Sequence, residues 1–186
     1  VLALKKEYDK DIEIHLGLET EYFPRFWDQL IDFLSDYPFE YFVLGQHSLG
    51  NEIEKILYSG HGTTDGSYLK PYVDQCLAGI DTGKYLYLAH PDLFLFNGDE
   101  AVFDREYRRL CREVKKRNIP LEINFLGLME ERWYPNEKFW KIAGEEGNTA
   151  VFGCDAHTPK AVWNPETEQK ALQLAAKYGL KVQETV

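Results

Sequence analysis

The sequence has few cysteines, few clustered basic residues and no long apolar run. Cys76, Cys111 and Cys154 are widely spaced and form no CxxC pair, which argues against a disulfide framework and fits a reducing cytoplasm. No segment is long and apolar enough to predict a membrane span. A net charge of −10 argues against nucleic acid as the main partner, because such binding depends on clustered Lys and Arg. We therefore expect a cytoplasmic location and neither a membrane nor a nucleic-acid partner.

The length of 186 residues is enough for one domain with a sizeable core. We expect a single domain over residues 1–186, since no linker or low-complexity segment interrupts the sequence. The first residues, from Val1, look like the tail of a helix. This start suggests that the sequence is missing an upstream segment or is a processed piece.

Apolar, β-rich runs alternate with helical patterns along the chain. The runs span residues 12–22, 41–49, 85–94, 121–128, 149–157 and 181–183, and the helical patterns span 24–36, 66–82, 100–117, 136–147 and 165–178. Asp99 is a plausible N-cap for the helix after it, and Asn164-Pro165 opens the last helix. This alternation predicts βαβ units and a mainly parallel sheet, which is an α/β fold.

Ligand-type side chains stand where four of the apolar runs end. They are Glu19 with Glu21, His47, His90, and Asp155 with His157. In barrels of alternating strands and helices the active site gathers at the carboxyl ends of the strands, so we expect these side chains to converge. If the last of the four strands continues to residue 157, alternation also turns Asp155 and His157 to the same face. Imidazole and carboxylate groups suit zinc, manganese or iron, so the pattern predicts a metal site.

Each of these residues also has an ordinary structural interpretation. Asp155 could cap a turn or a helix, and Glu21 could be an exposed alternate residue of its strand. His15 is expected to pack within its strand rather than to bind a ligand, and Cys154 is expected to point to the opposite strand face. His61 lies in the long irregular segment 50–67 and could be either a solvated loop residue or a substrate contact.

Four motifs resemble the histidinol-phosphatase branch of the polymerase and histidinol phosphatase (PHP) superfamily, in the same order. They are "GLETEYFPRFWDQLIDFLSDYPFEYFVLGQHSL", "LAHPDLF", "LEINFLGL" and "GCDAHTP". The resemblance covers nearly the whole chain from Ile12 to about Pro159. It implies a distorted (β/α)7 TIM-like barrel, N-terminally incomplete in this chain, with up to three divalent metal ions at one rim.

The resemblance also implies individual roles. Glu19 matches a bridging glutamate, and His47 and His90 match two histidines that share a metal with it. Asp155 matches a ligand of a second metal and His157 a ligand of a third, and these two residues would also act in catalysis. The HxH strand with which the family begins has no counterpart here, so only the set of Glu19, His47 and His90 is complete.

The function implied is hydrolysis of L-histidinol phosphate to L-histidinol and phosphate, in histidine biosynthesis. Arg132 and His61 are candidate substrate contacts, and Glu52 and Asp92 are candidate partners for the amine of histidinol. Two alternatives stay open: a PHP-type phosphoesterase acting on another small phosphate or a nucleotide, and a truncated, non-catalytic metal-binding domain. A homo-oligomer is possible, because a missing strand would leave an open edge on the barrel.

Overall fold

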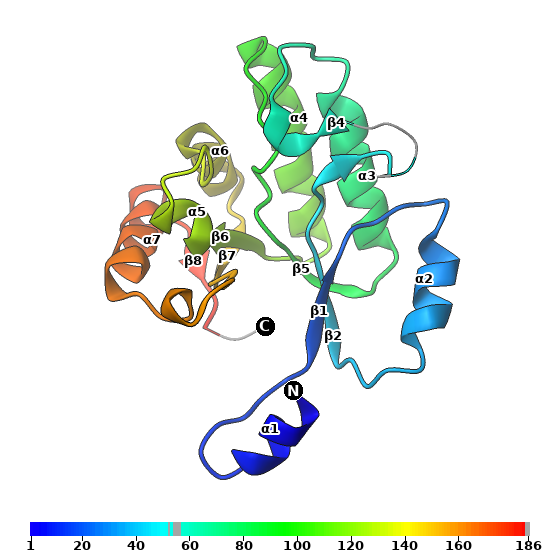
Figure 1. Ribbon diagram of the computed structural model, residues 1–186. Helices are drawn as coiled ribbons and strands as arrows, with labels where there is room; N and C mark the ends of the chain where they lie inside the picture. The colour runs from blue at the N-terminus through cyan, green and yellow to red at the C-terminus, as the bar shows by residue number, and fades with distance from the viewer. Residues whose placement is uncertain (52, 54–56, 185–186) are drawn as a thin grey trace.

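The computed structural model describes residues 1–51, 53 and 57–184 and has a six-stranded parallel sheet at its centre (Figure 1). From one edge of the sheet to the other, the strands follow the order β1-β2-β5-β6-β7-β8, which is also their order along the chain. A two-stranded antiparallel ribbon, β3 (Ser48–Leu49) and β4 (Leu57–Tyr58), stands apart. The sheet strands are β1 (Gly17–Thr20), β2 (Tyr41–Leu44), β5 (Tyr85–Leu88), β6 (Leu121–Asn124), β7 (Thr149–Gly153) and β8 (Lys181–Val182).

Helices connect the strands and cover the outside of the sheet. They are α1 (Leu2–Glu7), α2 (Trp27–Leu34), α3 (Leu69–Asp81), α4 (Glu100–Lys116), α5 (Phe125–Met129), α6 (Glu137–Glu146) and α7 (Pro165–Lys177), with 3-10 turns at Ser59–His61 and Pro159–Ala161. The predicted cap at Asp99 is confirmed, because its carboxylate accepts hydrogen bonds from the N–H groups of Ala101 and Val102. Asn164 caps α7 in the same way, through the N–H of Thr167.

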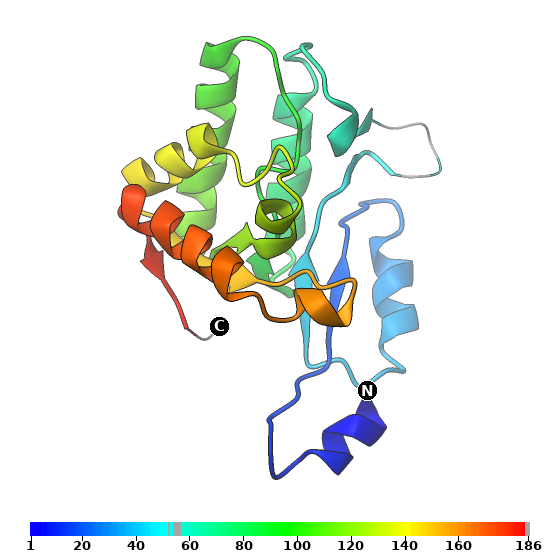
Figure 2. The ribbon, with the colours of Figure 1, turned by 60° about the vertical axis from the view of Figure 1, so that its left-hand side comes forward.

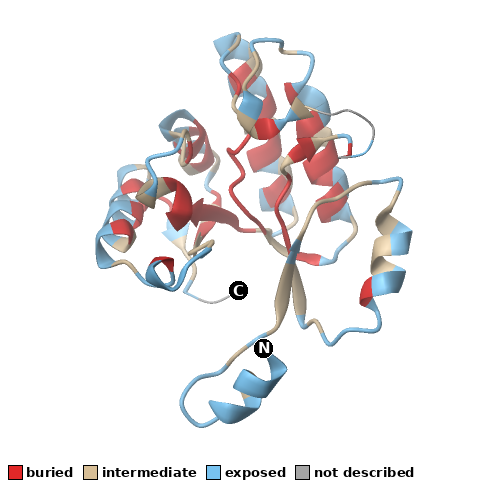
Figure 3. Ribbon diagram, in the orientation of Figure 1, coloured by how far each residue is buried: buried red, intermediate tan, exposed pale blue. Residues whose placement is uncertain are grey.

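The core lies between the sheet and helices α3, α4 and α6. The apolar stripe of α4 is buried completely or nearly so at Phe103, Tyr107, Leu110 and Val114. These residues recur every three or four positions, so they share the helix face that packs against α3 and α6. Figure 3 shows the buried residues gathered on the inner faces of these helices and on β6, and in β5 the two end residues Tyr85 and Leu88 are buried.

The alternation of parallel strands and helices is an α/β fold of the TIM-like barrel type, as predicted. The strands are shorter than the apolar runs, however. In the run 121–128 the strand ends at Asn124, whose side chain accepts the N–H of Gly127 and starts α5. The expectation that His15 packs within a strand is wrong: it precedes β1, is half-exposed, and faces Glu40 at 2.7 Å.

The first helix projects from the rest of the molecule (Figures 1 and 2). None of the residues of α1 is buried. Its attachment is polar: Lys5 pairs with Glu40, and the same carboxylate accepts the N–H of Leu16. This N-terminal arm, residues 1–16, therefore contributes little to the core.

Candidate metal centre

Three of the predicted ligands meet at the carboxyl ends of three neighbouring strands. Glu19 lies near the end of β1, His47 follows β2, and His90 follows β5. The Nε2 atoms of His90 and His47 lie 3.3 Å and 3.7 Å from the same Glu19 Oε1. One ligand atom from each residue lies within 4.8 Å of the others. The parallel register of β1, β2 and β5 thus brings together residues 71 positions apart in the chain.

The donor set fits a divalent transition metal. Zinc bonds to nitrogen and carboxylate oxygen are about 2.0–2.2 Å long, so two ligands of a tetrahedral ion are about 3.4 Å apart. The separations from Glu19 to the two histidines are close to that value. In addition, His90 Nδ1 is buried and has no hydrogen-bond partner among the described residues. Glu19, His47 and His90 could therefore hold an ion with small side-chain adjustments.

The three groups perturb one another electrostatically. Burial by itself would raise the pKa of Glu19, but its hydrogen bond to His90 and the charges of His90 and His47 lower it overall. Burial, followed by the neighbouring His90, lowers the pKa of His47. His90 is almost fully buried, which opposes its charge, yet the bond to Glu19 and the nearby carboxylates raise its pKa. The carboxylate is thus held ionised between two imidazoles.

A glycine makes room for the carboxylate of Glu19. A Cβ atom on Gly45, at the end of β2, would lie 1.8 Å from Glu19 Oε1. The next acidic residue of the strand end, Glu21, is partly buried and accepts the backbone N–H groups of His47 and Ser48 at 3.0 Å and 2.8 Å. Its Oε1 also faces His47 Nδ1 at 3.7 Å. Glu21 therefore shapes the turn that carries His47.

Asp155 and His157 line the same cavity as the cluster, but not by strand alternation. β7 ends at Gly153, and Asp155 has a positive φ of 47°. The strand does not continue to residue 157, so the condition for alternation to place both side chains on one face is not met. The turn makes Asp155 mostly buried, with 18% of its side chain exposed, and leaves His157 72% exposed. His157 Nδ1 lies 2.9 Å from the carbonyl oxygen of Asp155, a contact that orients the ring.

The first donor group is the cluster of Glu19, His47 and His90, and the second is the pair Asp155 and His157. Both groups line one cavity with a volume of about 480 Å³. Its lining carries three carboxylates, from Glu19, Glu130 and Asp155, and one guanidinium, from Arg132. Arg132 donates to Glu130 and, at 2.8 Å, to the hydroxyl of Tyr134. A phosphate dianion would meet net negative charge here unless cations were bound. The remaining lining residues are His47, Tyr58, His90, Leu93, Leu126, Tyr134 and His157.

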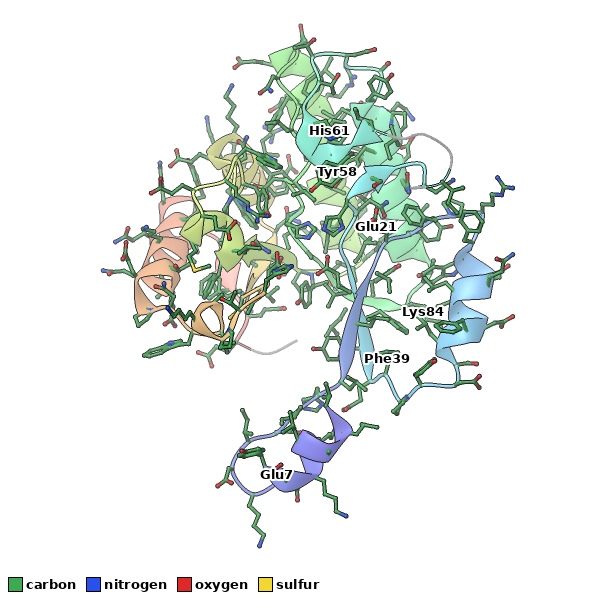
Figure 4. All side chains as sticks on the ribbon, viewed as in Figure 1. Glu7, Glu21, Phe39, Tyr58, His61 and Lys84 are labelled. Carbon is green, nitrogen blue, oxygen red and sulfur yellow. The ribbon has the colours of Figure 1, made fainter. Side chains whose placement is uncertain are left out.

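Several other predicted residues lie elsewhere. His61 is exposed, contacts the ring of Tyr58, and does not line this cavity (Figure 4). Asp92 is buried and accepts the N–H of Asn136, so it is not a rim residue for an amine. Cys154 donates from Sγ to the carbonyl of Val162. Glu52, the other candidate for the amine, lies outside the described residues.

Sequence reasoning missed two polar residues of β6. Glu122 and Asn124 are both buried, and they link His90 to Asp155 by hydrogen bonds. Burial raises the pKa of Glu122 in spite of the nearby His90. The signal was present in the sequence: an acid and an amide two positions apart in "LEIN", the same spacing that drew attention to Asp155 and His157.

The fold and the cluster together define an α/β, TIM-like barrel type of protein with a candidate metal centre at the carboxyl ends of its strands. Two solved structures share this architecture. One is histidinol phosphate phosphatase from Lactococcus lactis subsp. lactis Il1403, solved with zinc, L-histidinol and phosphate. It is 20% identical, has a TM-score of 0.68, and the match covers 97% of this chain and 72% of that chain.

The second structure is a protein from Listeria monocytogenes to which a histidinol phosphatase function has been assigned provisionally. It is 23% identical, has a TM-score of 0.64, and the match covers 90% of this chain and 72% of that chain. No family model matches the sequence, and no curated protein matches it. At these identities the likeness establishes the fold. In the described residues, no helix is long and apolar enough to cross a membrane.

Proposed function

We propose that this chain is a metal-dependent phosphomonoesterase domain and that its substrate is L-histidinol phosphate. The observation that carries the proposal is the convergence of Glu19, His47 and His90 within 4.8 Å at the carboxyl ends of three strands. The fold likeness to a phosphatase solved with zinc, L-histidinol and phosphate supports the choice of substrate. Zinc, manganese and iron all accept such a donor set.

The imidazole and charged side chains of the cavity have the following parts in this proposal. Glu19, His47 and His90 would hold one ion, and Asp155 with His157 would contribute to further ones. A divalent cation compensates the charge of the phosphate and makes attack by water easier. Arg132 would release Glu130 and donate hydrogen bonds to phosphate oxygens instead.

Asp155 and His157 would position the attacking water. The Asp155 carboxylate is held by Asn124, and the His157 ring is held by the Asp155 carbonyl oxygen, so both acceptors face the cavity in fixed orientations. His61 stays a candidate for substrate contact through its neighbour Tyr58, whose ring it contacts and which lines the cavity.

Metal binding is the first test. Chelator-stripped protein should take up zinc or manganese again, and the double variant His47→Ala/His90→Ala should lose the ion bound at Glu19. His15→Ala is the matched control, because His15 also pairs with carboxylates but stands outside the cavity. Elemental analysis after dialysis gives the stoichiometry. An unchanged stoichiometry in the double variant would remove the basis for the site.

A panel of phosphate esters, each assayed with the protein after it has taken up metal again, tests the choice of substrate. Release of phosphate from histidinol phosphate, stopped by a chelator, is the expected result. Preference for a nucleotide or another small ester would favour a different phosphoesterase of this fold. Metal binding without release of phosphate from any ester would favour a non-catalytic metal-binding domain. Light scattering in the same samples tests the expected homo-oligomer.

A further inference from the structure

Two buried side chains of β6 lie between the two donor groups of the cavity. Glu122 and Asn124 alternate along the strand with Leu121 and Ile123, which belong to the apolar core. Because alternate residues of a strand face opposite sides, Glu122 and Asn124 share the side opposite the core residues. Buried polar groups require hydrogen-bond partners, so their contacts show what they hold in place.

The contacts of Asn124 fix the orientation of its amide. Its Oδ1 accepts the N–H of Gly127 at 2.9 Å. Its Nδ2 therefore faces two carboxylate oxygens and donates to Glu122 Oε2 at 3.0 Å and Asp155 Oδ2 at 3.1 Å. An amide nitrogen carries two hydrogens, and both are used here. Only an amide can join a helix N–H to two carboxylates in this way.

Glu122 extends the connection to the metal cluster. Its Oε2 also accepts the backbone N–H of His90 at 2.9 Å. A continuous chain of hydrogen bonds thus runs from the backbone of His90 through Glu122 and Asn124 to the carboxylate of Asp155. It joins His90, a residue of the first donor group, to Asp155, a residue of the second.

Both residues at the ends of this chain have an unusual backbone conformation. His90 has φ 28° and Asp155 has φ 47°, in a region that residues other than glycine rarely occupy. Such conformations persist only where the surrounding structure holds them. Glu122 holds the N–H of His90 itself, and Asn124 holds the side chain of Asp155.

The neighbouring strand leaves room for this arrangement. A Cβ atom on Gly153, at the end of β7, would lie 1.6 Å from Glu122 Oε1. Gly153 pairs with Asn124 in the register of β6 and β7. A side chain at position 153 would therefore displace Glu122. This requirement is independent of the hydrogen bonds.

We propose that Glu122 and Asn124 are positioning residues that set the separation and orientation of the two donor groups, Glu122 through His90 and Asn124 through Asp155. They bind no metal themselves. The inference rests on the proposed function, because it concerns how the groups of that site are held. Loss of such supporting contacts typically weakens metal binding about 10- to 100-fold.

The first experiment compares Glu122→Gln with Glu122→Leu, using Co²⁺ alone as the probe. The Gln carbonyl can accept from both His90 and Asn124, so this variant should keep the wild-type Co²⁺ affinity and visible absorption spectrum. Leu has no acceptor, so affinity should fall at least about tenfold. Loss of affinity in the Gln variant as well would mean that the charge of Glu122 acts on the metal directly and would overturn the positioning role.

The second experiment compares Asn124→Ser with Asn164→Ser. Both asparagines cap a helix by accepting an N–H three residues on, and serine caps nearly as well. Only Asn124 donates to Asp155. We expect Co²⁺ to bind in two steps, first at the cluster of Glu19, His47 and His90 and then at a site that includes Asp155. Asn124→Ser should weaken the second step at least about tenfold and leave the first step within threefold of wild type. Equal titrations of the two serine variants would overturn the proposal for Asn124.

Hydrogen exchange in the metal-free protein separates this inference from the proposed function. The His90 amide should be protected in the wild type and in Glu122→Gln, and should exchange at least about tenfold faster in Glu122→Leu. If the wild type takes up no Co²⁺, the proposed function fails and the exchange rates alone decide the role of Glu122. Unchanged protection of His90 in Glu122→Leu would overturn the inference even if Co²⁺ binds.

Discussion

The residues of the candidate metal centre differ in their exposure to solvent. Glu19 and His47 form an open half, and His90 with its neighbours Glu122 and Asn124 forms a buried half. Glu19 and His47 come from β1 and β2 and have 39% and 36% of their side chains exposed, whereas His90, after β5, has 2%. This difference in exposure follows from the positions of the strands in the sheet. β1 is an edge strand, while β5 and β6 lie in the middle of the sheet, and β5 contacts α3. The buried half is already held by Glu122 and Asn124, so a bound ion would mainly have to order the open half.

The same substitution on each half provides the sharpest test of this contrast. Gly153→Ala would force the buried Glu122 away from His90 and Asn124. Overpacking and the broken hydrogen bonds together should lower the free energy of unfolding by about 3 kcal/mol. Urea unfolding of the metal-free protein measures the loss. A change below about 1 kcal/mol would show that the buried half is less rigid than its contacts indicate.

Gly45→Ala is the counterpart on the open half. Its Cβ would collide with Glu19 Oε1, but the half-exposed Glu19 side chain can turn toward solvent. We expect a loss of unfolding free energy below about 1 kcal/mol, together with a fall in metal affinity of about tenfold or more. Urea unfolding and a Co²⁺ titration measure the two effects. Equal destabilisation by both alanines would end the distinction between the halves.

A pH experiment probes the buried half in another way. Burial raises the pKa of Asp92 to about 7, above the 3.8 of an ordinary aspartate. Its neutral form therefore stabilises the folded state fully below about pH 4, and this stability is lost as pH rises through 7. Asn at this position can still accept the N–H of Asn136. Asp92→Asn should therefore gain on the order of 2 kcal/mol over wild type at pH 8 and nothing at pH 4.

Thermal unfolding of metal-free wild type and Asp92→Asn across that range gives the measurement. The two curves should diverge between pH 4 and 8. Parallel curves would mean that Asp92 is ionised in the folded protein, and would weaken the view of this half as a low-dielectric core.

The smallest effect is expected in the N-terminal arm. Glu40 joins Lys5, the N–H of Leu16 and His15, and these contacts hold its pKa at about 2. Glu40→Gln should raise hydrogen exchange within residues 2–16 and leave β5 and β6 unchanged, because α1 buries nothing. Exchange mass spectrometry by segment reads out both regions at once. Unchanged or slower exchange in the arm would show that Glu40 does not hold it, and a change in β6 would show that the arm is coupled to the core.

Patterns of residue type predicted the fold well and the supporting contacts poorly. The α4 stripe and the caps at Asp99 and Asn164 follow from local rules, so they could be read from the sequence. The parallel order of the strands then brought Glu19, His47 and His90 together. The positive φ of Asp155 is accompanied by a hydrogen bond from Asn124, 31 positions away, which no local pattern contains.

The connections between residues were harder to foresee than the residues themselves. Glu122 could have been noticed as an acid inside an apolar strand, but its partner His90 is 32 positions away. The clearance that Gly153 gives to Glu122 depends on the register of β6 and β7. The sequence makes Asp92 a candidate partner for the amine of histidinol, whereas its side chain turns inward to the start of α6.

The strand β6 has a consequence for how this sequence can vary. All four of its residues are buried, with Leu121 and Ile123 in the apolar core and Glu122 and Asn124 in the polar chain beside the cavity. A library randomised over these four codons should therefore return few folded, metal-binding clones. The eight residues of α2, of which only Leu34 is buried, should return many. Tolerance to mutation would then trace the buried half of the centre, so related sequences should diverge last at "LEIN".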